Sequence, residues 1–132
     1  MNVHLSTATI KSHENRSHKM NLSFNPIVFF ENSWPFPNSH LKEIFWEVRS
    51  EHIGIHSLNV ELSVDSPFEI KDNRNRNCIE FHLTKKNVPF QYDDYECEII
   101  FQAVIDSPHT SPVKIESSFI GVVKTVWSKG LV

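Results

Sequence analysis

The chain has 132 residues, of which 39% are hydrophobic and 11% aromatic, and its formal net charge is −3. This apolar content is enough to build the core of one domain, so the composition excludes global disorder. The weak negative charge argues against nonspecific nucleic-acid binding, because phosphate backbones attract basic surfaces. Only 3 glycines occur, which excludes the glycine-rich loops that cradle nucleotide phosphates, and we expect no cofactor.

The N-terminal residues 1–20 are polar and contain no apolar run of the length that a signal peptide needs. We expect them to form a tail, or one weak strand, ahead of a single domain over residues 21–132. No segment approaches 18 consecutive apolar residues, so we expect no membrane insertion. Cys78 and Cys97 are predicted to be reduced thiols, and these features together predict a cytoplasmic protein.

Residues 22–37 are rich in aromatic side chains but are interrupted by three prolines. Proline lacks a backbone N–H, so long regular structure cannot persist through this stretch. We predict a short strand near residues 27–30, followed by an irregular loop. The aromatic side chains of the segment either pack on a sheet or face a partner.

Residues 39–49 are predicted to be the one helix. Their apolar residues follow the i, i+3, i+4, i+7 spacing of a helical stripe, and Ser39 can cap its start. A strand is the competing interpretation, because apolar residues also alternate from residue 44 to residue 48. The stripe consists of Leu41, Ile44, Phe45 and Val48.

The rest of the chain predicts four strands, over residues 55–64, 78–84, 94–105 and 113–127. Apolar and polar residues alternate in each run, which is the period of a half-buried strand. The connections between these runs are polar and contain prolines, as in turns. The expected fold is therefore α+β but mainly β: a four-stranded antiparallel meander with one helix and the aromatic-rich segment.

The last two predicted strands also carry apolar residues on their second face. A sheet that is apolar on both faces must be covered on both faces. The helix and the aromatic segment cover one face at most. We therefore expect the other to be a homo-oligomer interface or a binding surface, and the candidates are Ile100, Val104, Ile120, Val122 and Val126.

Two residue pairs resemble chemical sites but fit a structural role better. His52 and His56 have the i, i+4 spacing of helical metal ligands, but Gly54 and its β-branched neighbours predict a strand there. Cys78 and His82 lie four residues apart on a predicted strand, roughly 13 Å, which is too far for a thiol and its base. We expect neither a metal site nor a catalytic residue, and hence no enzyme.

An acidic cluster opens the third predicted strand and includes Asp93, Asp94, Glu96 and Glu98. Glu96 and Glu98 share a strand face, with backbones roughly 7 Å apart. Paired carboxylates can act as acid and base, but a row of them more often keeps a face solvated or attracts a basic partner. The cluster is the candidate docking patch.

The order of these strands resembles the sheet of the SecB-like export chaperones over residues 55–127. A strand ending in Ser-Pro is followed by a short alternating strand, a polar loop and two long strands. The third strand opens with Tyr-Glu and the fourth contains Gly121. The matching runs are 60–67 (VELSVDSP), 79–83 (IEFHL), 94–104 (DYECEIIFQAV) and 114–123 (KIESSFIGVV).

This resemblance implies an oligomeric, ATP-independent chaperone that holds extended, unfolded polypeptide. SecB-like proteins continue into helices after the fourth strand, and the predicted helix at 39–49 would have to replace them. Exposed aromatic side chains bind apolar client segments, and edge strands add an extended peptide. The candidate client contacts are Phe29, Phe30, Trp34, Phe36 and Trp46.

Two other functions suit a small acidic β-rich chain. One is an inhibitor or immunity-type protein that binds a single folded target. The other is an assembly component of a phage or a secretion machine. A holdase binds many unfolded chains weakly, whereas an inhibitor binds one folded partner tightly, so the partner distinguishes them.

Overall fold

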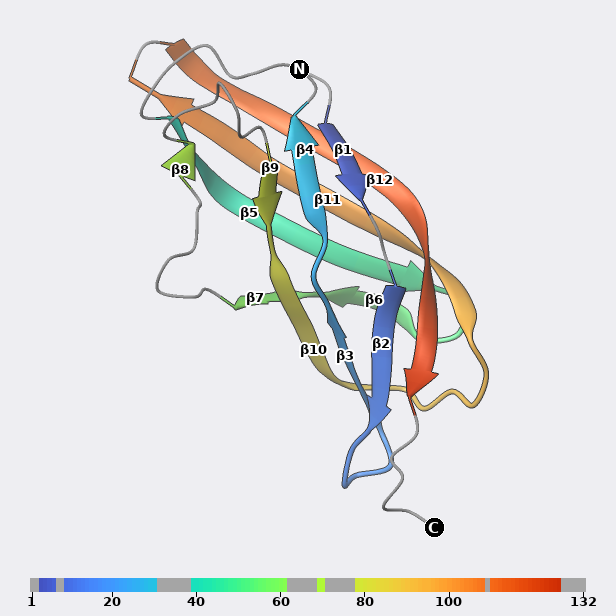
Figure 1. Cartoon of the computed structure of the whole chain (residues 1–132). Coiled ribbons are helices and arrows are strands. Elements are labelled where there is room, and N and C mark those ends of the chain that lie inside the picture. Colours follow the sequence, from blue (N-terminus) through green and yellow to red (C-terminus); the bar gives the residue numbers. More distant parts are fainter. Residues whose placement is uncertain are drawn as a thin grey trace.

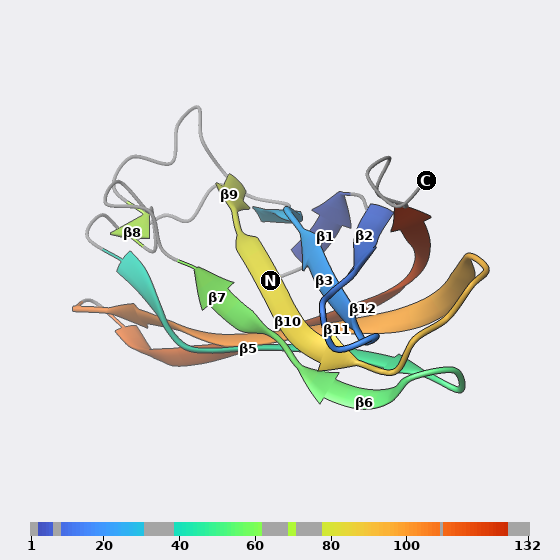
Figure 2. The same ribbon diagram turned by 90° about the horizontal axis from the view of Figure 1, so that it is seen from below.

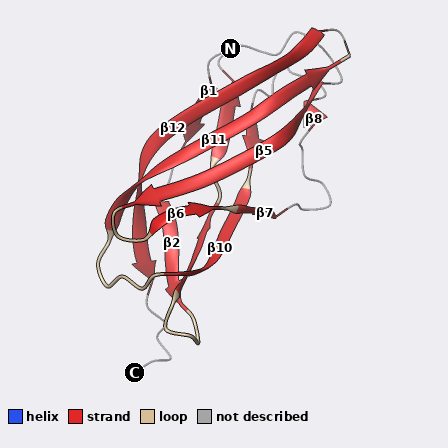
Figure 3. Cartoon of the chain, turned by 180° about the vertical axis from the view of Figure 1, so that it is seen from behind, coloured by secondary structure: helices blue, strands red, loops and turns tan. Residues whose placement is uncertain are grey.

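The computed structural model describes residues 3–6, 9–30, 39–61, 69–70, 78–108 and 110–126. This described part consists of strands, turns and loops and contains no helix (Figures 1 and 3). It accordingly holds no helix of the length and apolarity needed to cross a membrane. The prediction of an α+β fold with one helix is therefore wrong.

Twelve strands occur in the described residues. They are β1 (Val3–Ser6), β2 (Thr9–Glu14), β3 (Met20–Phe24), β4 (Ile27–Phe30), β5 (Ser39–Ser50), β6 (Gly54–Ser57), β7 (Asn59–Glu61), β8 (Glu69–Ile70), β9 (Cys78–Glu80), β10 (His82–Val88), β11 (Tyr95–Ser107) and β12 (Thr110–Val126).

Nine of these strands form one sheet in the order β6-β5-β11-β12-β2-β3-β10-β7, with β8 also paired to β5. All neighbours are antiparallel except β12 and β2, which are parallel. The two ends of the sheet, β6 and β7, are separated only by Leu58, whose N–H donates to the Trp46 carbonyl at 2.8 Å. The sheet therefore curls until it nearly closes, with β2, β3 and β10 crossing over β5, β11 and β12 (Figure 2).

The other three strands form a small sheet in the order β1-β4-β9. Each directly precedes or follows a strand of the large sheet: β1 leads to β2, β3 to β4, and β9 to β10. Proline cannot donate to a ladder, and Pro26 lies at the junction where β3 ends and β4 begins. At the same level Phe81 separates β9 from β10, and its N–H donates to the Pro26 carbonyl at 2.9 Å.

The segment predicted as a helix at 39–49 is strand β5, and a bulge explains the error. The register against β11 shifts between Gln102 and Val104, and Glu43 has a left-handed φ of 51°. One extra residue in a strand reverses which residues face the core. Leu41 therefore faces the core together with Trp46, and the combined spacing imitates a helical stripe.

The prediction of a four-stranded meander is also wrong, although individual strands in it are present. The two long strands with their turn are β11 and β12, and the short strand predicted at 27–30, outside the meander, is β4. β10 pairs with β3 and β7 and not with β11, because β5 and β12 flank β11. The polar N-terminal residues 9–14 form β2 in the large sheet.

The core lies inside the curled sheet and centres on aromatic rings from both of its halves. Trp46 on β5 is 1% exposed and lies directly opposite Phe101 on β11, with ring centroids 4.6 Å apart. Its ring is also 5.3 Å from Phe81 and 6.3 Å from Phe24. These contacts connect β5 and β11 to the strands that cross over them. They hold the sheet in its curled form, with the aromatic rings inside and the other face of β5, β11 and β12 outside.

Candidate functional site

Alternation along β11 divides its side chains between the core and the outer face of the sheet. Tyr95, Cys97, Ile99 and Phe101 are buried in the core, whereas Glu96, Glu98 and Gln102 are exposed outside. Because the two strands pair in register, the outer face of β12 presents the residues directly opposite. The outer surface of this hairpin is therefore a continuous face of two long strands.

The five candidate interface residues all lie on this outer face but differ in exposure. Ile100 and Val104 are each only 7% exposed, so most of their surface is already covered. Ile120 is 64% exposed, and Val122 and Val126 are 37% and 38% exposed. The three candidates that remain exposed therefore all belong to β12.

Two exposed carboxylates run beside this apolar surface. Glu96 lies directly opposite Val122, and Glu98 lies directly opposite Ile120. Directly opposite residues have Cβ atoms about 5 Å apart. Within the described part of the chain neither carboxylate has an ion-pair partner. We call these four residues the β11–β12 strip: an acidic row beside an apolar row.

The neighbouring strand β5 adds a positive charge that is already paired. Arg49 lies opposite Glu98, but its Nε donates to Glu47 Oε2 at 2.5 Å. Glu47 is only 8% exposed, so its carboxylate has lost most of its contact with water. The ion pair with Arg49 compensates for this loss. The acidic row therefore keeps its negative charge.

Asp94 differs from the other three residues of the predicted acidic cluster because it holds the loop before β11 against β12. Its Oδ1 accepts from the Thr125 N–H at 3.0 Å, and its Oδ2 accepts from Lys124 Nζ at 3.2 Å. The Thr125 N–H and then Lys124 lower the pKa of the Asp94 carboxyl below its ordinary value of 3.8. Asp93 and Asp94 are both exposed, but Asp93 has no hydrogen-bond or ion-pair partner within the described residues.

A lowered pKa makes the charged form of Asp94 favour the folded state. This stabilisation is present above pH 3.8 and is lost as the pH falls through the folded-state pKa. The unfolding temperature, measured by circular dichroism, should therefore fall less between pH 5 and pH 2 in Asp94→Asn than in the unmodified protein. Asp93→Asn is the matched control, and an equal change in that variant would contradict the assignment.

The five candidate client contacts do not form one exposed cluster in the described residues. Phe29 is half-buried on β4, and Trp46 is a core residue. The side chain of Phe30, as well as Trp34 and Phe36, lies outside the described residues. The exposed apolar side chains that the structure does present are aliphatic ones on β12, together with Ile55 and Tyr92.

The three histidines of the residue pairs considered above make structural contacts. The His52 ring packs 5.2 Å from the Tyr95 ring, and His56 Nε2 hydrogen bonds with the Ile53 carbonyl at 2.6 Å. His82 Nδ1 hydrogen bonds with Asn25 Oδ1 at 3.0 Å. The described residues contain no group of three or more metal-ligating side chains.

Cys97 is a free, buried thiol next to the β12 backbone. Its Sγ donates weakly to the Gly121 carbonyl at 3.8 Å. Burial raises the pKa of this thiol to about 11. It is therefore protonated at neutral pH and is a poor nucleophile.

The chain matches no protein-family model and no curated protein.

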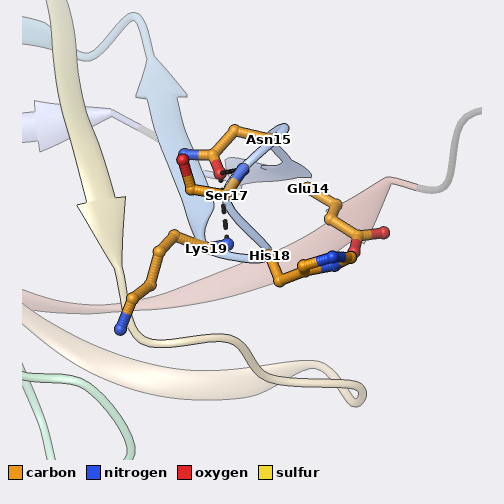
Figure 4. Close-up of polar contacts among 5 residues, drawn as sticks. All are labelled: Glu14, Asn15, Ser17, His18 and Lys19. Carbon is orange, nitrogen blue, oxygen red and sulfur yellow. Dashed lines mark hydrogen bonds and ion pairs between the residues drawn. The ribbon is translucent and has the colours of Figure 1, made fainter.

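The β2–β3 hairpin carries a polar cluster that the sequence did not predict. Asn15 Oδ1 accepts from the Ser17 and Lys19 N–H groups at 2.9 and 3.1 Å (Figure 4). Asn15 Nδ2 donates to Oδ1 of Asn21 at 3.0 Å and of Asn87 at 2.7 Å. The Asn87 N–H in turn donates to Asn21 Oδ1 at 3.2 Å. Three asparagines thus tie the hairpin turn to the end of β10.

Cationic side chains surround this asparagine cluster. Arg16 and Lys19 are exposed in the turn, and Lys85 and Lys86 precede Asn87 on β10. We call these four cations the basic tip. The only carboxylate in the turn, Glu14, contacts His18 at 3.3 Å. The four cations and this one carboxylate leave an excess of three positive charges.

Proposed function

We propose that this protein is a non-catalytic polypeptide-binding protein that engages its partner on the β11–β12 strip. One observation carries the proposal: Ile120, 64% exposed, lies directly opposite the unpaired carboxylate of Glu98. Exposed apolar side chains that lie together mark interaction surfaces more often than scattered ones do. Val122 and Glu96 repeat the same arrangement two residues along the strands.

The strip also specifies the chemistry of the partner. Aliphatic side chains favour apolar residues, and the adjacent carboxylates favour lysine or arginine. An unfolded chain in which apolar and basic residues are close together presents both groups at once. This supports a holdase that works without ATP, the activity that the SecB-like resemblance implies, with the strip and not the aromatic candidates as the contact surface.

The test is suppression of aggregation. A chemically unfolded, slow-folding protein is diluted into buffer with the purified protein, without ATP, and light scattering is recorded. We expect suppression at near-stoichiometric ratios. Ile120→Thr combined with Val122→Thr should raise the concentration needed by about thirtyfold, because each substitution removes roughly 1 kcal/mol of apolar contact.

Ile55→Thr is the matched control. Ile55 is 65% exposed and lies in the same cross-strand row as Ile120, three strands away and roughly 14 Å distant. It should leave suppression unchanged. An equal loss in both variants would reject the strip as the site. Absence of suppression by the unmodified protein would reject the holdase activity. It would favour an inhibitor or an assembly component, which binds a single folded target.

A further inference from the structure

The basic tip is a rigid and protruding feature of the molecule. The β2–β3 hairpin extends beyond the neighbouring strand ends (Figure 1), and the Asn15 side chain fills its turn. The Lys19 side chain extends away from the turn in Figure 4. Within the described part of the chain, Arg16, Lys19 and Lys86 have no ion-pair partner. A fixed positive charge without a counter-charge attracts an acidic surface.

The same chain carries a complementary surface in the acidic row of Glu96 and Glu98. Both carboxylates are exposed and unpaired within the described residues. Glu96 is level with Val122, which pairs with Thr9 on β2. The basic tip begins beyond Glu14, five residues further along β2 and so roughly 17 Å from that level. The tip and the acidic row of one molecule therefore cannot meet.

From this arrangement we propose that the protein self-associates head to tail, with the basic tip of one copy on the β11–β12 strip of the next. The contact pairs Arg16 and Lys19 with Glu96 and Glu98 and covers Ile120 and Val122. Because the two surfaces differ, the contact is heterologous and builds rings or open chains, not a closed two-fold dimer. A second copy fits better than nucleic acid, since the turn over residues 15–19 has no Phe, Tyr or Trp, the large aromatic side chains on which successive bases stack.

Self-association shares the strip with the proposed function but does not depend on it. A bound client and a second copy would compete for the same residues. Reversing the charge of the tip should weaken self-association and leave client binding intact. Changing the strip should affect both. The two proposals can therefore fail separately.

The experiment is sedimentation velocity of the full chain at low and at high salt. At low salt, where surface charges act over tens of ångströms, we expect assemblies larger than a monomer; high salt should dissociate them. Arg16→Glu with Lys19→Glu, and separately Glu96→Lys with Glu98→Lys, should each weaken association by at least about tenfold, because like charges then face each other. An equimolar mixture of the two variants should associate again.

Lys42→Glu with Lys114→Glu is the matched control for the tip variant, because it makes the net charge more negative by the same amount but flanks Val104 at the other end of β11. It should associate like the unmodified protein. If a reversed variant is misfolded by circular dichroism, Arg16→Gln with Lys19→Gln replaces it. A monomer at low salt, a mixture that stays monomeric, or a monomer whose tip binds heparin would each overturn the proposal.

Discussion

Replacing Trp46 with alanine should lower the free energy of unfolding by about 3–5 kcal/mol, the largest effect that we expect from a single substitution. Its ring lies within 6.3 Å of three other aromatic rings, from both halves of the curled sheet. Removing the ring leaves a large cavity that these neighbours cannot fill. Urea unfolding followed by far-ultraviolet circular dichroism measures the loss.

Trp46→Phe is the informative control for this experiment. The indole Nε1 is buried and has no hydrogen-bond partner in the structure. Phenylalanine therefore removes no hydrogen bond and keeps most of the apolar contact, so it should cost much less than alanine. If alanine cost under about 1 kcal/mol, Trp46 would be a surface residue, in agreement with the original client-contact assignment.

Replacing Asn15 with alanine should lower the free energy of unfolding by about 2 kcal/mol, because four side-chain hydrogen bonds are lost at a partly exposed site. The loss should be local as well as global. The Ser17 and Lys19 amides donate hydrogen bonds to Asn15 Oδ1. Hydrogen exchange at these two amides should therefore accelerate more than exchange in β11.

Asn15→Asp separates the two halves of this network. The carboxylate still accepts from Ser17 and Lys19, so these amides should stay protected. It cannot donate to Asn21 and Asn87, and it places a negative charge against their carbonyl oxygens. Aspartate should therefore release the hairpin from β10 without opening the turn. Unchanged stability in both variants would show that the tip is not held by Asn15.

Local patterns in the sequence predicted much of the β11–β12 hairpin. Apolar residues at every second position from Tyr95 to Ile105 and the proline-containing turn predicted these strands, and their second apolar face identified Ile120 and Val122 as outward-facing. This information is contained within about 30 consecutive residues. The exposed half of the candidate site was therefore accessible from periodicity alone.

The errors arose where structure depends on distant residues or on a break in periodicity. The bulge at Glu43 reverses the alternation of β5, and no local pattern distinguishes the result from a helical stripe. The strand order depends on which edges meet in space, so the separation of β10 from β11 was not predictable. The asparagine cluster requires Asn15 to approach Asn87, 72 residues later in the chain.

The parallel pairing of β2 with β12 determines when the fold can be completed during synthesis. Residues 9–13 have their partner strand at 122–126, more than a hundred residues later. The edge of β2 therefore stays open while almost the whole domain is being made, and only its hairpin with β3 can form early. Pairings this distant in sequence make folding slow and leave the nascent chain prone to aggregation. The emerging chain should therefore benefit from protection at the ribosome until its last long strand is released.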